Sequence, residues 1–309
     1  KLRGRDRLLA IRPKRFQRPR NLPRRTIILV MMLVVGHRCP VFASDAPLIR
    51  ATFSDERSTS PRTVEGRSIV TAVDGGMILL GRDGKMWTIQ PDAIKEKVDL
   101  DQPFTPLGGD EMVARLAEEL GDSFSFYRTQ NYIIAFNGNE RHARRAGALF
   151  EQLHRGFFTF WKNQRWKLPE PDFPLVAIVL RDRKSYLRYA TDRIGETAES
   201  LIGFYNIASN RMITYDVPNW ERNVATVIHE ATHQLAYNCG MQTRFADNPM
   251  WVSEGLAMFF ESPDMRSPGR WRSIGRVNRT NLARWRNYLP RRGGDSLATL
   301  LADDKRYRN

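Results

Sequence analysis

Residues 229–233 read His-Glu-Ala-Thr-His, and Glu254 follows twenty-one positions after the second histidine. Two histidines four apart on a helix project from the same face, so both imidazoles can reach one metal ion. A catalytic zinc ion takes three protein ligands and keeps a fourth position for water. We therefore predict that His229, His233 and Glu254 bind one Zn2+ ion per chain. Glu230, beside the first histidine, can take a proton from the zinc-bound water.

The flanking sequence predicts two consecutive helices that carry these side chains. Residues 223–236 place apolar residues at helical spacing around the two histidines. Residues 248–249, Asn-Pro, are typical of an N-cap followed by proline at the first helical position, which predicts a second helix over 250–261. The alternative, a solvated helix with two incidental histidines, conflicts with the apolar residues on both sides of the motif.

This pair of helices resembles the gluzincins, zinc peptidases whose third ligand is a glutamate on the following helix. Residues 251–261, Trp-Val-Ser-Glu-Gly-Leu-Ala-Met-Phe-Phe-Glu, are similar to the aminopeptidase-like form, which has Glu-Gly-aromatic-Ala and another acid seven positions on. Leu256 stands where that form has the aromatic residue. From about Asp110 onward the chain is most similar to the bacterial peptidase-MA-like domain family of unknown function, but the specific motifs cover only residues 223–261.

The resemblance implies the same ligands and base, and a role for Glu261 in orienting a ligand histidine. An ordinary exposed acid at the helix end is the alternative for Glu261. The Gly-x-Met-Glu-Asn segment with which aminopeptidases hold a substrate amino terminus is absent from the sequence, which favours an endopeptidase over an exopeptidase. Zinc peptidases also place a donor opposite the base to stabilise the oxyanion. The candidates, each with packing or the surface as its alternative, are Tyr205, Tyr215, Arg244 and Tyr288.

The function predicted from these residues is a secreted zinc-dependent peptidase that acts on a peptide or protein substrate. Zinc polarises the scissile carbonyl, and Glu230 moves a proton from the metal-activated water to the leaving amine. The rival hypothesis is a catalytically silent protein that keeps the peptidase fold for binding at the cell envelope. The intact Glu230 argues against it, because a scaffold has no need of a base.

The charge of the chain is concentrated at its beginning. The 309 residues carry a formal net charge of +15, but residues 1–43 hold twelve of the 49 Lys and Arg residues and one of the 34 acids. The remainder has a net charge of only +4, which argues against a nucleic-acid partner. A basic stretch, an apolar run over 27–35 and Val41-Phe42-Ala43 predict a bacterial signal peptide cleaved near Ala43, and a secreted, periplasmic or cell-envelope location. An uncleaved amphipathic anchor is the alternative, because the run is too short for a stable membrane span.

The fold class predicted for the rest is α+β, a zincin-like metallopeptidase domain preceded by a small SH3-like β-meander. Residues 44–62 are polar and predict a linker, and Asp-Gly turns between apolar runs predict strands at 66–73, 77–80 and 86–90 within a β module at 63–98. Residues 110–309 form the predicted peptidase domain. Because zincins have further helices after the last ligand, we expect this domain to be truncated at its C-terminus.

Within that domain the pattern predicts helices at 111–120 and 140–161, and strands at 125–128, 132–137, 175–180, 201–205 and 212–217. Met212–Tyr215 is a candidate edge strand that pairs with the substrate main chain, an ordinary sheet strand being the alternative. His142 and His154 are expected on the surface or at its boundary. The segment Arg266–Arg292 has nine arginines, two tryptophans and no acid. It predicts either contact with an anionic polymer or envelope surface, or a solvated face.

Overall fold

The computed structural model describes residues 46–55, 58–217, 220–262 and 274–303. The predicted signal peptide over 1–43 lies outside the described residues, as do residues 266–273 of the arginine-rich segment. Among the helices that the structure does describe, none combines the length and apolar character needed to cross a membrane.

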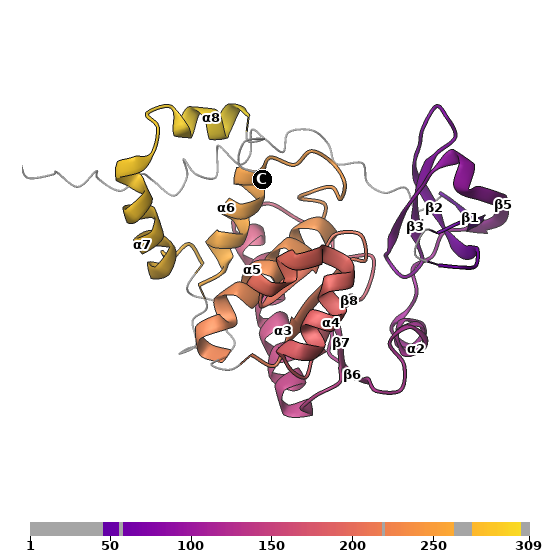
Figure 1. The fold of residues 1–309 in the computed structure, drawn as a ribbon, viewed down its shortest axis with the longest axis horizontal. Coiled ribbons are helices and arrows are strands. Elements are labelled where there is room, and N and C mark those ends of the chain that lie inside the picture. The colour runs from indigo at the N-terminus through magenta and orange to yellow at the C-terminus, as the bar shows by residue number, and fades with distance from the viewer. Residues whose placement is uncertain (1–45, 56–57, 218–219, 263–273, 304–309) are drawn as a thin grey trace, which may run out of the picture. The chain divides into compact units, whose positions relative to one another are not determined.

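The first part of the described chain is a five-stranded antiparallel sheet in the order β4-β3-β2-β1-β5 (Figure 1, indigo to purple). The strands expected at 66–73, 77–80 and 86–90 are confirmed as β2, β3 and β4. Gly75 and Gly84 in the connecting turns have φ angles of 94° and 80°, which side chains disfavour. The strand bounds are β1 Pro47–Phe53, β2 Arg62–Thr71, β3 Met77–Gly81, β4 Met86–Ile89 and β5 Ile94–Pro103.

Two strands of this sheet were not predicted. β1 lies within the stretch predicted to be a linker, and that prediction is wrong for Pro47–Phe53, where Ile49, Ala51 and Phe53 alternate into the core. β5 continues beyond residue 98, the predicted end of the module. Ile49 faces both Gly66 and Asp99. β1 therefore needs a partner some fifty residues away, and such non-local pairing leaves no hairpin signal.

The second sheet is mixed and has the order β6-β7-β8-β10-β9. β7, β8 and β10 run parallel, and β6 and β9 pair antiparallel at the two edges. The prediction that Met212–Tyr215 is an edge strand is wrong, because these residues belong to β10, which is buried between β8 and β9. The edge strand next to β10 is β9. The bounds are β6 Ser125–Arg128, β7 Tyr132–Phe136, β8 Leu175–Leu180, β9 Gly203–Asn206 and β10 Arg211–Tyr215.

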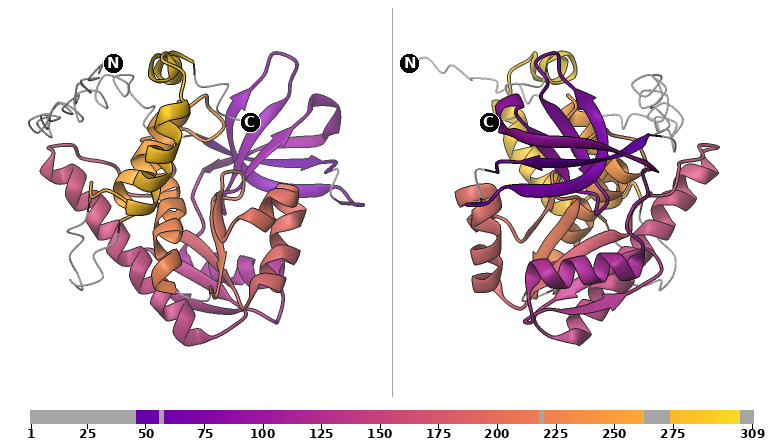
Figure 2. Two further views of the ribbon diagram at one scale, coloured as in Figure 1. Left: turned by 60° about the vertical axis from the view of Figure 1, so that its left-hand side comes forward. Right: turned by 90° about the vertical axis from the view of Figure 1, so that its right-hand side faces the viewer.

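Helices cover both faces of the mixed sheet, so the fold is α+β (Figures 1 and 2). Alternate residues of β7, β8 and β10 share one core with α2 and α4. On the opposite face, Tyr132 of β7 stacks on Phe150 of α3, with ring centroids 5.2 Å apart. The helices are α2 Gly109–Leu120, α3 Glu140–Asn163, α4 Arg183–Ile194, α5 Trp220–Asn238, α6 Met250–Phe260, α7 Arg279–Tyr288 and α8 Ser296–Ala302, with 3-10 turns at Pro91–Ala93, Gly195–Ser200 and Leu289–Arg291.

The two helices that carry the predicted ligands are confirmed as α5 and α6. Val227, Ile228 and Leu235 of α5 are fully buried. Gln234, also on α5, donates from Nε2 to the carbonyls of Val176 and Asn210, each at 3.0 Å, which ties the helix to the sheet. The packing thus fixes how α5 is rotated about its axis.

The predicted N-cap of α6 is wrong. Asn248 is not the N-cap, because Pro249 occupies that position and the Asn248 amide bonds to the backbone of residue 243 instead.

A partly buried ion pair joins α2 to the mixed sheet. Arg211, 2% exposed, donates from Nη1 and Nη2 to Glu119 at 2.6 and 2.9 Å, and Lys85 Nζ reaches Glu119 at 2.6 Å. Burial by itself raises the pKa of Glu119. The charges and hydrogen bonds of Arg211 and Lys85 outweigh burial and lower the pKa from 4.5 to about 2. The Glu119 carboxylate therefore stabilises the folded chain in its ionised form.

We expect Glu119→Gln to lower the free energy of unfolding at pH 7 by about 3 kcal/mol, because Arg211 is left buried without its anion. The stabilisation is complete above the ordinary pKa of 4.5 and is lost as the pH falls towards 2. Urea denaturation of the variant and the parent between pH 7 and pH 2.5 measures the difference. Glu118→Gln removes the exposed neighbouring carboxylate and is the control, expected within about 0.5 kcal/mol of the parent. A difference for Glu119→Gln that does not change with pH would contradict this account.

Candidate metal centre

The structure brings the three predicted ligands together. Glu254 Oε2 lies 3.1 Å from His229 Nε2, and Glu254 Oε1 lies 3.6 Å from His233 Nε2. One donor atom from each residue lies within 4.8 Å of the other two. Both histidines are mostly covered, whereas the Glu254 side chain is 49% exposed, so the cluster opens to solvent on the glutamate side.

These distances fit a tetrahedral zinc ion. Zinc bonds of 2.0–2.1 Å to nitrogen and oxygen place neighbouring ligand atoms about 3.3 Å apart. The separations of Glu254 Oε2 from His229 and of Glu254 Oε1 from His233, 3.1 and 3.6 Å, lie on either side of that value. Two imidazoles and one carboxylate are also the donor set of a zinc site that keeps a fourth position for water. His229, His233 and Glu254 therefore form a candidate metal site.

Glu261 lies directly behind the first ligand. Its Oε2 is 3.0 Å from His229 Nδ1, and the residue is only 4% exposed. It is thus not an exposed acid at the helix end. Its other oxygen, Oε1, accepts hydrogen bonds from the side-chain amides of Asn278 at 2.8 Å and Asn281 at 2.9 Å. With Nδ1–H donated to Glu261, His229 presents Nε2 to the metal position.

Charge and burial set the protonation of the ligands. Burial alone lowers the pKa of His229, but hydrogen bonds with Glu254 and Glu261 outweigh it and raise this pKa to about 10. Burial lowers the pKa of His233 to about 4, with the charge of His229 acting in the same direction. The hydrogen bond with His229 lowers the pKa of Glu254. His233 is therefore neutral, the form that binds metals, and the proton held by His229 is the one that a cation displaces.

Glu230 shares the site without contributing one of the three clustered ligand atoms. Its Oε2 accepts the backbone N–H of Tyr205 on β9 at 3.0 Å. Burial raises the pKa of Glu230 to about 7, and the charge of His229 and the Tyr205 hydrogen bond limit the rise. A carboxylate held in place next to a metal position has the placement that a general base requires.

A cleft of about 830 Å³ runs past the candidate site. It is lined by His229 and Glu230 from α5, by Met258 and Glu261 at α6, and by one side of α7. The α7 residues in the lining are Thr280, Asn281, Arg284, Trp285 and Tyr288, with Asn278 just before the helix.

Of the four predicted oxyanion donors, only Tyr288 lines this cleft. The Tyr205 hydroxyl donates to Asn210 Oδ1 at 2.8 Å. Tyr215 is buried against Tyr186, with ring centroids 5.0 Å apart. Arg244 donates from Nη1 to the carbonyls of residues 84 and 207. These three side chains are therefore committed elsewhere.

Apart from Tyr288, the side chains that α7 and its N-cap bring to the site were not predicted from the sequence. Asn278 has a recognisable signal as a helix cap, since asparagine is favoured at the position just before a helix, here before Arg279. Nothing local indicates that its amide reaches Glu261, seventeen positions earlier in the chain. Arg284 and Trp285 were seen only as members of an arginine-rich segment, and their place in the cleft depends on how α7 packs.

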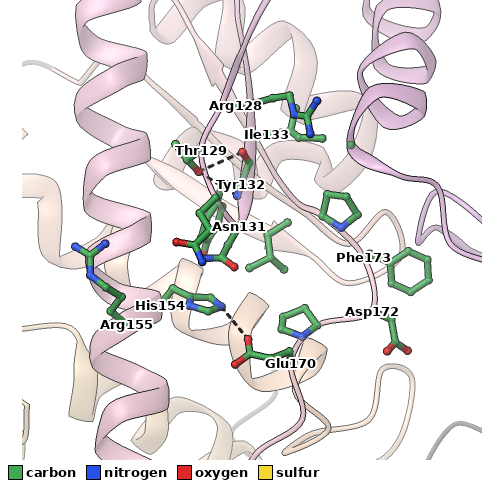
Figure 3. Close-up of a pocket in the computed structure, with 15 residues that line it drawn as sticks. Arg128, Thr129, Asn131, Tyr132, Ile133, His154, Arg155, Glu170, Asp172 and Phe173 are labelled. Atoms are coloured by element: carbon green, nitrogen blue, oxygen red, sulfur yellow. Dashed lines mark hydrogen bonds and ion pairs between the residues drawn. The ribbon is translucent and has the colours of Figure 1, made fainter.

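A second cavity, of about 620 Å³, lies away from the predicted ligands (Figure 3). His154 lines it, and His154 Nε2 is 3.6 Å from Glu170 Oε2. His142 lies elsewhere, with Nδ1 2.9 Å from Asp216 Oδ1. Both histidines are buried, at 8% exposure or less, so the expectation that they lie on the surface or at its boundary is wrong. Neither belongs to the metal cluster.

Comparison with known families covers the same part of the chain as the candidate site. Residues 223–309 match the family model described as "Protein of unknown function (DUF1570)". The match spans α6 and α7 and most of α5, and therefore the three ligands, Glu261 and the α7 side of the cleft. No curated protein matches the chain. These comparisons identify no enzyme family for it.

We expect the full chain to bind one zinc ion, because three suitable donors already converge. Free zinc at 100 times its Kd should raise the free energy of unfolding by about 2.7 kcal/mol. Glu254→Gln should remove both the bound metal and this stabilisation. Glu170→Gln, the same change at the second cavity, is the control. Metal analysis after gel filtration and thermal unfolding give the readouts, and zinc retained at full stoichiometry by Glu254→Gln would exclude this carboxylate as a ligand.

Proposed function

We propose that this protein is a zinc-dependent peptidase with a zincin-like domain, acting outside the cytoplasm after removal of residues 1–43. One observation carries the proposal. A fourth polar group, Glu230, lines the same cleft as His229 and adds no ligand atom to the cluster of His229, His233 and Glu254. A site that only stores or structures a metal has no use for such a carboxylate.

When bound, a zinc ion supplies a Lewis acid for the scissile carbonyl and lowers the pKa of its water. Glu230 then accepts a proton from that water and returns it to the leaving amine. The hydrogen bond from the Tyr205 N–H fixes one oxygen of Glu230, so that Oε1 remains for the water. Glu261 keeps the His229 ring oriented, through the contact at Nδ1.

The remaining parts of a peptidase site are assigned by position. Tyr288 lines the cleft and stabilises the oxyanion, since its side chain is 41% exposed and the other three candidates are committed elsewhere. The substrate main chain pairs with β9, which is the edge strand of the mixed sheet beside the metal site and is anchored to Glu230 through Tyr205. The arginines of α7 outside the cleft, Arg279 and Arg286, remain available to an anionic envelope surface.

The alternative is a silent scaffold that binds at the envelope. It leaves the position of Glu230 beside His229 in the cleft unexplained, because a scaffold gains nothing from a partly buried carboxylate whose charged form is disfavoured by burial.

Glu230→Gln should keep one zinc ion per chain and lose hydrolysis, by about 10²-fold or more, because Gln preserves the shape but cannot accept the proton. The assay is digestion of a broad peptide library by the full chain, with and without a chelator, read by mass spectrometry. Metal analysis of the same samples separates loss of the base from loss of the site. Cleavage by Glu230→Gln at the parental rate would rule out this residue as the base.

Tyr288→Phe should lower kcat by about 10²-fold with little change in KM, because an oxyanion donor acts in the transition state. Tyr127→Phe, which removes a hydroxyl on β6 away from the cleft, is the matched control. Equal kcat values for the two variants would remove Tyr288 from the mechanism and leave the metal and the base unaffected.

A further inference from the structure

Helix α7 is held against the metal-binding helices mainly by polar contacts. None of its ten residues is buried. A cavity of about 330 Å³ lies between α6 and α7, lined by Met258 and Phe259 on one side and by Leu282 and Trp285 on the other. Because little apolar surface is removed from water here, hydrophobic burial contributes little to docking α7.

The polar contacts gather at the end of α6. The amides of Asn278 and Asn281 donate to Glu261 Oε1, as described above. Just before α7, the N–H of Gly275 donates to the Phe259 carbonyl at 2.8 Å, and Gly275 has a φ of 76°. A Cβ at Gly275 would approach the Phe259 ring to 2.8 Å, so a larger residue does not fit this contact. The start of α7 is thus fixed beside α6, the helix that carries Glu254.

The side-chain amide of Asn278 bonds both to the N-terminus of α7 and to the Glu261 carboxylate. Its Oδ1 caps α7 by accepting the backbone N–H groups of residues 280 and 281, at 2.9 and 3.2 Å. Its Nδ2 donates to Glu261. The start of α7 and the carboxylate that contacts His229 are therefore fixed by the same side chain.

Glu261 is consequently held from two sides. Oε1 receives two amide donors from the α7 segment, and Oε2 receives Nδ1 of His229. If α7 moves away, Glu261 loses two donors and can rotate, and His229 loses the partner that selects its ring orientation. Partners of this kind typically change metal affinity by about 10- to 100-fold.

We propose that Asn278 and Asn281 are positioning residues that link α7 to the metal site, so that metal binding and docking of α7 stabilise each other. The inference rests on the zinc site of the proposed function, but not on hydrolysis. Thermodynamic linkage is reciprocal. If docking of α7 raises the affinity of the site for zinc by some factor, then bound zinc must favour the docked position of α7 by the same factor. Since α7 forms one side of the cleft, its cleft-lining side chains then reach their places together with the metal.

The test uses the full chain and two readouts that need no activity. The first is zinc affinity, measured by competition with a chelator, together with the visible absorption spectrum of the Co2+-loaded protein. The second is trypsin cleavage after Arg284 and Arg286, identified by mass spectrometry, with and without zinc. Both arginines lie on α7, so cleavage there reports how often the helix leaves its docked position.

The decisive variant is Asn278→Ser, because serine preserves the helix cap but is too short to reach Glu261. Asn281→Ser removes the second donor. Asn287→Ala, an exposed position on the same helix outside the cleft lining, is the control for general effects on α7. We expect each serine variant to bind zinc at least 10-fold more weakly and to shift the Co2+ spectrum. Zinc should slow cleavage of α7 in the parent and in Asn287→Ala, and slow it less in the serine variants.

The outcomes distinguish the coupling between α7 and the metal site from the proposed peptidase activity. Parental zinc affinity and spectrum in both serine variants would overturn the linkage while leaving the metal site in place. Zinc that fails to slow cleavage in the parent would overturn it as well. Zinc linkage in a chain that cleaves no peptide would support this inference and count against the peptidase. A parent that binds no zinc would remove the basis of both.

Discussion

The whole site depends on how α5 is rotated about its axis. α5 must bury Val227, Ile228 and Leu235 to pack on the sheet and α3, and this fixes its rotation about its axis. The same rotation leaves His229, Glu230 and His233 less buried than these residues, on the side where α6 brings Glu254. The apolar residues and the polar residues of the motif occupy different sides of α5. The helix can therefore pack in the core and present its histidines to a metal without loss to either. Rotation of α5 by one residue would bury the histidines and expose its apolar face.

The features predicted correctly from the sequence are those that local spacing determines. The ligand set follows from a four-residue interval and a second helix with its own turn signals. α5, α6, β7 and β8 likewise have apolar patterns complete within their own residues. Phe157 of α3 packs on Phe260 of α6, with ring centroids 4.9 Å apart. The sequence shows that both are apolar, but not that they meet.

The features that the sequence did not reveal depend on pairings across long stretches of chain. β10 and β9 have similar local patterns, and which of them forms the sheet edge depends on β8 pairing with β10. Arg211 and Glu119 are 92 positions apart, so neither indicates that the other neutralises it. α4 buries only Ser185, Tyr186 and Ala190, too weak a stripe to be distinguished from a loop. Tertiary contacts, rather than local propensity, decide these elements.

The turn between β3 and β4 is hydrogen-bonded to segments far along the chain, which limits the sequence changes it can accept. Its Gly84 carbonyl accepts a hydrogen bond from Arg244 on the α5–α6 connection, and the N–H of Met86 donates to the Ala208 carbonyl in the β9–β10 turn. A Cβ at Gly84 would come within 3.3 Å of Asn210 and Phe173. Replacing the N-terminal sheet of this chain with an unrelated module would thus remove a hydrogen-bond acceptor from the Arg244 guanidinium and a donor from the β9–β10 turn. Insertions and deletions in related chains should spare this turn and accumulate at the turn around Gly75, where a Cβ would meet nothing within 4 Å.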